Sequence, residues 1–211
     1  CLDRATIATS IYGLADPLYW YVPSYCNAYD PDCEGNYYQY DPEHAKELVA
    51  NSNYDGTPIR LVAVNSFAKM TELSQAMVSM LQDAGFVVDL QMIEHSALNE
   101  MRGGGQYDIF ISNYAFTTDA SWFLEIQIVA DRGHFEFDNQ EIKDMITEAN
   151  QILDETERAD VMREVCRMCA ELYGPQMPMF TMQTTMATRD DVSGYIMFPN
   201  YGMYLFDMGV G

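Results

Sequence analysis

The residues best suited to bind or transform a ligand lie in one segment, "NYAFTTDASWF", which spans residues 113–123 and follows an apolar stretch. Aromatic side chains are mixed there with hydroxyl, amide and carboxylate groups, and small-ligand sites combine apolar walls with a few such polar groups. The predicted ligand-binding residues are Asn113, Tyr114, Phe116, Thr117, Thr118, Asp119 and Trp122. The alternative is that Phe116 and Trp122 are core aromatics that touch no ligand.

Other reactive residue types show no pattern that would support catalysis or metal binding. His44, His95 and His134 are scattered, with no histidine pair at helical spacing, which argues against a zinc site. Cys166 has no neighbouring base that would make it a nucleophile. A hydrolase needs two carboxylates across one cleft, and among 32 acidic residues a pair in the sequence means little. We therefore expect no enzyme, no metal and no cofactor, with a hydrolase or sensor domain as the alternative from another class.

Two loops partly match known binding patterns. The acidic residues of "DPDCEGNYYQYD", 30–41, fall at calcium-loop offsets, but the last is Asp rather than Glu and helical flanks are lacking, so chance is the favoured explanation. "RGGGQ", 102–106, lacks the Lys-Ser/Thr pair of a phosphate loop and follows a predicted helix, so it predicts a helix end. A further alternative is a surface-display module that uses the Tyr-rich segment 12–40 to bind a macromolecule.

Composition and charge exclude several classes of protein. Of the 211 residues 48% are hydrophobic, which indicates a globular chain large enough to bury a core. The formal net charge is −21, and such a field repels phosphate backbones, so nucleic acid is not an expected partner. No apolar run reaches the roughly 18 residues that a membrane span needs. Contact with a membrane is expected only through an N-terminal anchor outside this sequence.

The five cysteines do not form a complete disulfide framework, because their number is odd. Cys26 and Cys33 lie in one loop and could pair in an oxidising compartment, so their redox state stays open. Cys166 and Cys169 lie three residues apart on a predicted helix, and we expect both to face a core as small apolar residues.

Hydrophobic periodicity and turn signals predict an alternation of strands and helices, which indicates an α/β unit with parallel strands. These central elements are expected as strand 59–64, helix 69–85, strand 86–93, helix 96–105 and strand 107–112. The other expected elements are a helix over 1–12, a helix that starts at Asp41-Pro42, helices over 139–153 and 155–173, a strand over 177–188 and an extended stretch over 192–202.

Two of these helices have predicted faces. One apolar face of helix 69–85 carries Met70, Leu73, Met77, Met80, Leu81 and Ala84. Asp41 is the predicted N-cap of the earlier helix, with Pro42 in its first turn. The predicted inner face of that helix consists of Ala45, Leu48 and Val49.

Several short motifs follow one another in a characteristic order: "CLDRATI" at 1–7, "GLADP" at 13–17, "YDPEHAKEL" at 40–48 and "GQYDIFIS" at 105–112. Together with the closing helices they resemble the extracellular solute-binding proteins of ABC importers of the dipeptide, oligopeptide and nickel class, solute-binding family 5. The resemblance extends along essentially the whole chain but only to the C-terminal part of that family. It implies that Cys1 takes the place of a mid-chain alanine.

The resemblance implies a fold: an α/β, periplasmic-binding-protein-like (class II) C-terminal lobe with a mixed sheet flanked by helices. It also implies three parts of the chain. Residues 1–40 would hold a hinge-proximal helix and an interlobe loop, residues 41–190 the ligand-binding lobe, and residues 191–211 an extended segment that returns toward a first lobe.

The same resemblance implies a function without catalysis. The chain would bind a peptide or related small solute by lobe closure, at the extracellular face of the membrane or in the periplasm, and deliver it to ABC transporter permease subunits. In family members that bind peptides, an aspartate of this segment pairs with the ligand's ammonium group. Counting back from the Trp-Phe-Leu sequence, Phe116 takes that position here, and Asp119 is the nearest carboxylate. A hydrophobic peptide, a glycan or a metal chelate are therefore alternative ligands.

Overall fold

The computed structural model describes residues 1–37, 39–114, 117–131, 137–172, 174–183, 185–197, 203–204 and 206–210. The helical elements are α1 (Arg4–Thr6), η1 (Ile7–Tyr12), α2 (Pro42–Asn51), α3 (Met70–Asp83), η2 (His95–Ala97), α4 (Leu98–Gly103), α5 (Ser121–Leu124), η3 (Glu125–Val129), α6 (Gln140–Ala149) and α7 (Glu155–Glu171). The strands are β1 (Ala15–Pro17), β2 (Ile59–Val64), β3 (Val88–Ile93), β4 (Ile109–Ile111), β5 (Phe180–Met182), β6 (Val192–Ser193), β7 (Ile196–Met197), β8 (Met203–Tyr204) and β9 (Gly209–Val210).

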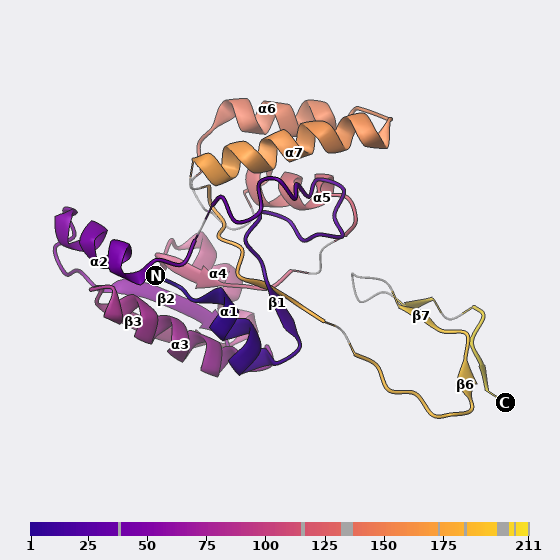
Figure 1. Ribbon diagram of the computed structural model, residues 1–211, viewed down its shortest axis with the longest axis horizontal. Coiled ribbons are helices and arrows are strands. Elements are labelled where there is room, and N and C mark those ends of the chain that lie inside the picture. The colour runs from indigo at the N-terminus through magenta and orange to yellow at the C-terminus, as the bar shows by residue number, and fades with distance from the viewer. Residues whose placement is uncertain are drawn as a thin grey trace.

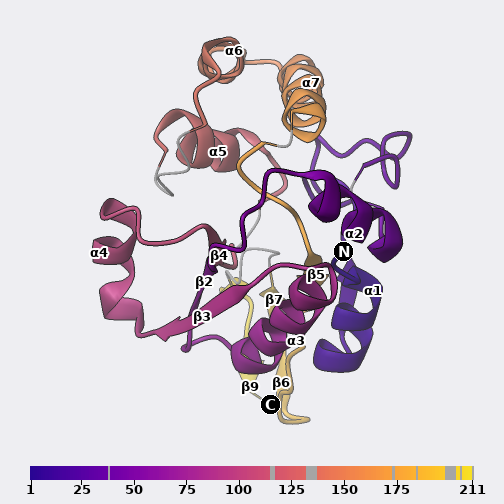
Figure 2. The ribbon, with the colours of Figure 1, turned by 90° about the vertical axis from the view of Figure 1, so that its left-hand side faces the viewer.

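The central sheet has three parallel strands in the order β3-β2-β4, as the alternating pattern predicts. Leu61 of the middle strand pairs with Leu90 on one side and Ile109 on the other. β2 is the middle strand, and its last four side chains are fully buried. Because the strands are parallel, their carboxyl ends lie at the same end of the sheet (Figures 1 and 2).

α3 covers this sheet with its predicted apolar face. Met70, Leu73, Met77 and Leu81 are buried in one cluster with Leu61 of β2, and Met80 packs against the same cluster. This placement confirms the predicted face, because side chains three and four residues apart lie on one side of a helix. The π-helix η1 and the residues before it close the same core with Leu2 and Ile7.

α2 begins as predicted but packs differently. The side chain of Asp41 accepts a hydrogen bond from the backbone N–H of His44 at 2.9 Å, and Pro42 occupies the first turn, which confirms the N-cap. The predicted inner face is wrong for Leu48, which is 58% exposed, whereas Ala45 and Val49 are half-buried and no residue of this helix is fully buried. α2 lies at the margin of the lobe (Figure 1), and only part of its apolar face is covered, with Val49 packed beside Gly85.

Because α2 buries no side chain, its stability depends strongly on its cap. We expect Asp41→Ala to weaken α2 by about 1 kcal/mol, which corresponds to roughly fivefold faster amide hydrogen exchange within the helix. Asp41→Asn should exchange like the wild type, since the amide oxygen still caps the helix. Equal acceleration in both variants would contradict the assignment of Asp41 as the cap.

A second core lies between the helices α5, α6 and α7 and the segment from residue 20 to residue 29 (Figure 1). Trp20, Ile142, Ile146 and Met162 are fully buried there. Cys166 and Cys169 are fully buried in the same core, as predicted for small apolar side chains.

The loop cysteines are thiols in this structure. Cys26 is buried in the second core, and burial raises the pKa of its thiol to about 11. Cys33 lies nearer the surface, and its Sγ donates to a carboxylate oxygen of Asp30 at 3.4 Å. Whether the two cysteines pair under oxidising conditions stays a prediction.

The part of the chain after β5 forms an extended C-terminal arm. β5 pairs antiparallel with β1, and only three residues of the predicted strand 177–188 belong to it, because β1 offers only three partners. Beyond β5 the chain extends away from both cores and forms two short antiparallel pairs, β6 with β9 and β7 with β8 (Figure 1). No helix of the described residues is both long and apolar enough to cross a membrane.

Candidate functional site

The candidate site is the edge of the sheet where β2, β3 and β4 end. Ligands of open α/β folds bind at the carboxyl ends of parallel strands. Asn65 follows β2, Glu94 follows β3 and Asn113 follows β4, and all three side chains are exposed. Nδ2 of Asn65 donates to Oε1 of Glu94 at 2.6 Å, so two of these polar groups already contact each other. Sequence reasoning missed Asn65 and Glu94, although their positions directly after two strands were a usable signal.

Two of the predicted aromatic residues are exposed: Tyr114, three residues after β4, and Trp122 in α5. The rings of Tyr114 and Phe123 meet edge to face with centroids 5.6 Å apart, which fixes the tyrosine against α5. Trp122 is 55% exposed, so the alternative that it is a core aromatic is wrong. Phe116, like His134, lies outside the described residues.

The loop that carries the remaining predicted residues is held by hydrogen bonds within itself and to another segment. Oγ1 of Thr117 donates to the carbonyl of Asp119 at 2.6 Å, and the carbonyl of Thr118 accepts from the N–H of Asn27 at 2.8 Å. Through Asn27 the loop is tied to the segment that forms the second core. The predicted site residues therefore lie on a loop with defined backbone partners.

The carboxylate of Asp119 is already occupied. One oxygen accepts from Nη2 and Nε of Arg158 at 2.9 and 3.2 Å, and the other accepts from the N–H of Ser121 at 2.8 Å. Desolvation by burial would raise the pKa of Asp119, but hydrogen bonds from Ser121 and Arg158 outweigh it and lower that pKa. An ammonium group of a ligand would have to compete with Arg158 for this carboxylate.

An arginine outside the predicted set reaches the site. Arg102 comes from the last turn of α4, and its guanidinium carbon lies 4.7 Å from the centroid of the Phe110 ring, within the range of a cation–π contact. Nη2 lies 3.5 Å from the hydroxyl oxygen of Tyr114. The sequence offered little signal for this residue, because its contacts bridge a helix end and the residues of and after the next strand.

A second arginine holds β4 in place. Arg60 of β2 donates from Nη2 and Nε to the two carboxylate oxygens of Asp108 at 2.8 and 3.1 Å, and its N–H reaches the same carboxylate. Its Nη1 reaches the carbonyl of Gly105, whose φ of +58° lets the chain turn from α4 toward β4. The aspartate of the Tyr-Asp motif thus has a structural role, since it fixes the strand from which the candidate loop starts.

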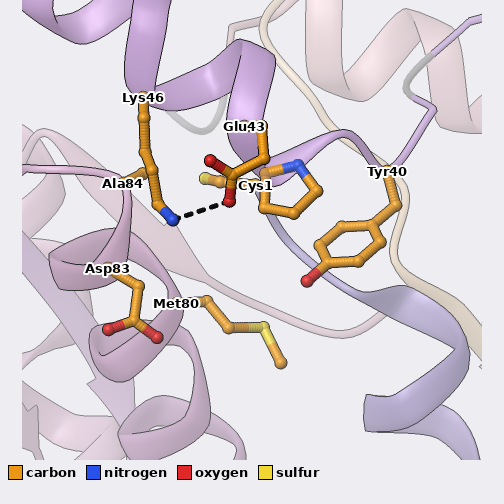
Figure 3. Close-up of a pocket in the computed structure, with 8 residues that line it drawn as sticks. Cys1, Tyr40, Glu43, Lys46, Met80, Asp83 and Ala84 are labelled. Atoms are coloured by element: carbon orange, nitrogen blue, oxygen red, sulfur yellow. Dashed lines mark hydrogen bonds and ion pairs between the residues drawn. The ribbon is translucent and has the colours of Figure 1, made fainter.

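A cavity of about 260 Å³ lies elsewhere, where residue 1 meets α2 and α3 (Figure 3). Its polar wall contains Lys46, whose Nζ donates to an oxygen of Glu43 at 2.8 Å, and Asp83 faces this pair. None of the predicted site residues lines this cavity.

The described residues contain no group of three histidine, cysteine, aspartate or glutamate side chains placed to hold a metal ion. In the loop with calcium-like spacing, the oxygens of Asp30 instead accept from the N–H of Asp32 and the thiol of Cys33. These bonds are the ordinary side-chain to backbone contacts of a turn.

The parallel sheet with its flanking helices and its site at the strand ends defines a lobe of the periplasmic-binding-protein-like class. Residues 1–132 match the model of a protein family described as "Bacterial extracellular solute-binding proteins, family 5 Middle". The chain belongs to this family. A comparison with curated proteins found no match.

Solved structures share this fold at low sequence identity. A dipeptide-binding protein from Pseudoalteromonas sp. SM9913 in complex with Met-Leu superposes with a TM-score of 0.82 at 20% identity, over 100% of this chain and 43% of that one. The oligopeptide-binding protein AppA of Bacillus subtilis, in complex with a nonapeptide, gives 0.79 at 19% identity, over 100% and 45%. NikA of Staphylococcus aureus in complex with Ni(L-His)₂ gives 0.74 at 17%, over 95% and 44%. The chain thus spans less than half the length of these structures.

Proposed function

We propose that this chain is the C-terminal lobe of the substrate-binding component of an ABC importer, and that it binds peptides or a related small solute without transforming them. The observation that carries the proposal is the exposed edge at the ends of β2, β3 and β4, with aromatic and polar side chains on a family 5 fold. The protein works outside the cell membrane or in the periplasm and delivers its solute to permease subunits.

The proposed binding surface is built from the predicted residues in different roles. Tyr114 and Trp122 form the apolar walls, and Asn113 and Thr118 supply exposed polar groups beside them. Thr117 and Asp119 support the loop through their hydrogen bonds, and Phe116 remains a predicted contact that would take the place of an ammonium anchor.

The solute is enclosed between this lobe and a second one. The related structures are more than twice as long as this chain, which leaves room for another lobe. Two-lobed proteins of this kind close about a hinge around the ligand. The exposed apolar residues of the C-terminal arm, Ile196 and Phe206 among them, are suited to pack against such a lobe.

Trp122 provides a direct test. The chain has two tryptophans, of which Trp20 is fully buried and Trp122 is 55% exposed. When the dipeptide Met-Leu is added to the full-length protein, we expect the emission to shift to shorter wavelength, because binding removes the exposed indole from water. The thermal midpoint should rise, and mass spectrometry should recover the dipeptide unchanged.

The matched control is Trp122→Phe, which keeps an aromatic wall and leaves Trp20 as the only emitter in this chain. This variant should still be stabilised by the dipeptide but should lose the spectral shift. Cleavage of the dipeptide would contradict the absence of catalysis. A spectral shift of unchanged size in Trp122→Phe would mean that Trp122 is not part of the binding surface.

A further inference from the structure

We propose that Arg102 and Tyr114 form the anchor for a carboxylate group of the bound solute. This inference rests on the proposed function and deepens it, because it names the charged group that the site recognises. Its basis is a guanidinium and a hydroxyl that converge beside the candidate loop: Nη2 of Arg102 lies 3.5 Å from the hydroxyl oxygen of Tyr114.

Arg102 differs from most basic residues of the chain in having no carboxylate partner among the described residues. The chain holds 32 acidic and 11 basic residues, so a carboxylate partner is easy to find. Seven basic residues of the described part form ion pairs with Asp or Glu within 4.0 Å: Lys46, Arg60, Lys143, Arg158, Arg163, Arg167 and Arg189. Arg102 has no such pair among the described residues.

The structure holds this guanidinium without neutralising it. Its central carbon lies over the ring of Phe110, and the ring of Tyr107 meets Phe110 edge to face with centroids 5.9 Å apart. Nε of Arg102 is buried with no hydrogen-bond partner in the described part of the chain. A guanidinium without a carboxylate partner favours an acceptor supplied by a bound molecule, which would reach its terminal nitrogens rather than the buried Nε.

Tyr114 adds a second donor. Its hydroxyl oxygen accepts from Arg102, and its own proton has no acceptor among the described residues. Two oxygens of one carboxylate can therefore receive an N–H from the guanidinium and the O–H of the tyrosine. A carboxylate fits better than a phosphate, because a dianion would meet stronger repulsion from a chain of net charge −21.

The test compares the dipeptide Met-Leu with its C-terminal amide, by calorimetric titration of the full-length protein. We expect the wild type to bind the acid about 10- to 100-fold more tightly than the amide, the range of a lost charged hydrogen-bond pair. Arg102→Gln should lower the affinity for the acid to that for the amide, and Tyr114→Phe should lose part of the preference.

Two further variants separate this role from a general charge effect. Arg102→Lys keeps the charge but loses the planar fork, so it should restore only part of the preference for the acid. Arg189→Gln changes the net charge equally, but Arg189 pairs with Asp191 on the exposed arm, so its preference should equal that of the wild type.

The outcomes distinguish the inference from the proposed function. Equal affinity of the wild type for acid and amide, or an unchanged preference in Arg102→Gln, overturns the carboxylate anchor and leaves the peptide receptor standing. Failure of the wild type to bind Met-Leu or any member of a mixture of two- to five-residue peptides overturns the proposed function, and the anchor with it.

Discussion

Replacing Trp20 with alanine should lower the free energy of unfolding by about 3–5 kcal/mol, the range for removing a large buried aromatic side chain. Trp20 is completely buried in the second core, and its ring lies 5.9 Å from that of Tyr37. The alanine variant leaves a cavity between the segment from residue 20 to residue 29 and the helices α5, α6 and α7, which do not collapse to fill it.

The matched control is the other tryptophan. Trp122→Ala removes the same side chain from a position that is 55% exposed, so its unfolding free energy should stay within about 0.5 kcal/mol of the wild type. Urea denaturation of both variants measures the difference. Equal losses at the two positions would mean that Trp20 does not anchor the second core.

The sequence predicted the central elements well because their signals are local. Apolar residues at helical spacing located α3, and the short apolar runs bounded by turns located β2, β3 and β4. The cap of α2 was predictable from Asp41 and Pro42, since capping depends on residues within one turn.

The errors arose where tertiary neighbours decide the outcome. Leu48 belongs to a helical apolar pattern, yet it is 58% exposed among the described residues, and periodicity alone cannot report whether a side chain has a partner. The strand expected over 177–188 is three residues long because its length follows that of β1, which lies more than 160 residues earlier in the chain.

The candidate site was predictable in part. The segment after β4 was selected from its composition, and Trp122 is exposed, while the contact of this segment with a ligand stays a prediction. Arg102 and the pair formed by Asn65 and Glu94 escaped prediction, because each contact joins residues from separate elements. The ion pair of Asp119 with Arg158 spans 39 positions, so the sequence could not show that this carboxylate has a partner.

That ion pair leads to the second large effect. The side chain of Arg158 is 17% exposed and that of Asp119 33%, and Nη1 of Arg158 also donates to the carbonyl of Ile152 at 2.7 Å. Arg158→Met should lower the free energy of unfolding by about 2–3 kcal/mol, because it leaves a partly buried carboxylate and a carbonyl without their donor. Asp119→Asn should cost less, about 1–2 kcal/mol, since partial exposure screens the pair.

The difference between Asp119→Asn and the wild type should depend on pH. The folded-state pKa of Asp119 is lowered, so the stability from its ionised form is present above the unfolded pKa of about 3.9. It is lost as the pH falls through the folded-state pKa. Denaturation at pH 6 and near pH 3 should therefore show the gap between the two proteins shrinking on acidification. A gap of constant size would contradict an ionised Asp119 as the source of the stability.

The same variants decide what Asp119 does for the ligand. If its carboxylate serves the fold, Asp119→Asn loses stability but keeps most of its affinity for Met-Leu, because the loop retains the contacts of Thr117 and Thr118. If the carboxylate instead takes the ammonium group of the peptide, the variant loses about tenfold or more in affinity while its stability hardly changes. The hydrogen bonds to Arg158 and Ser121 favour the first result, since they already use both carboxylate oxygens.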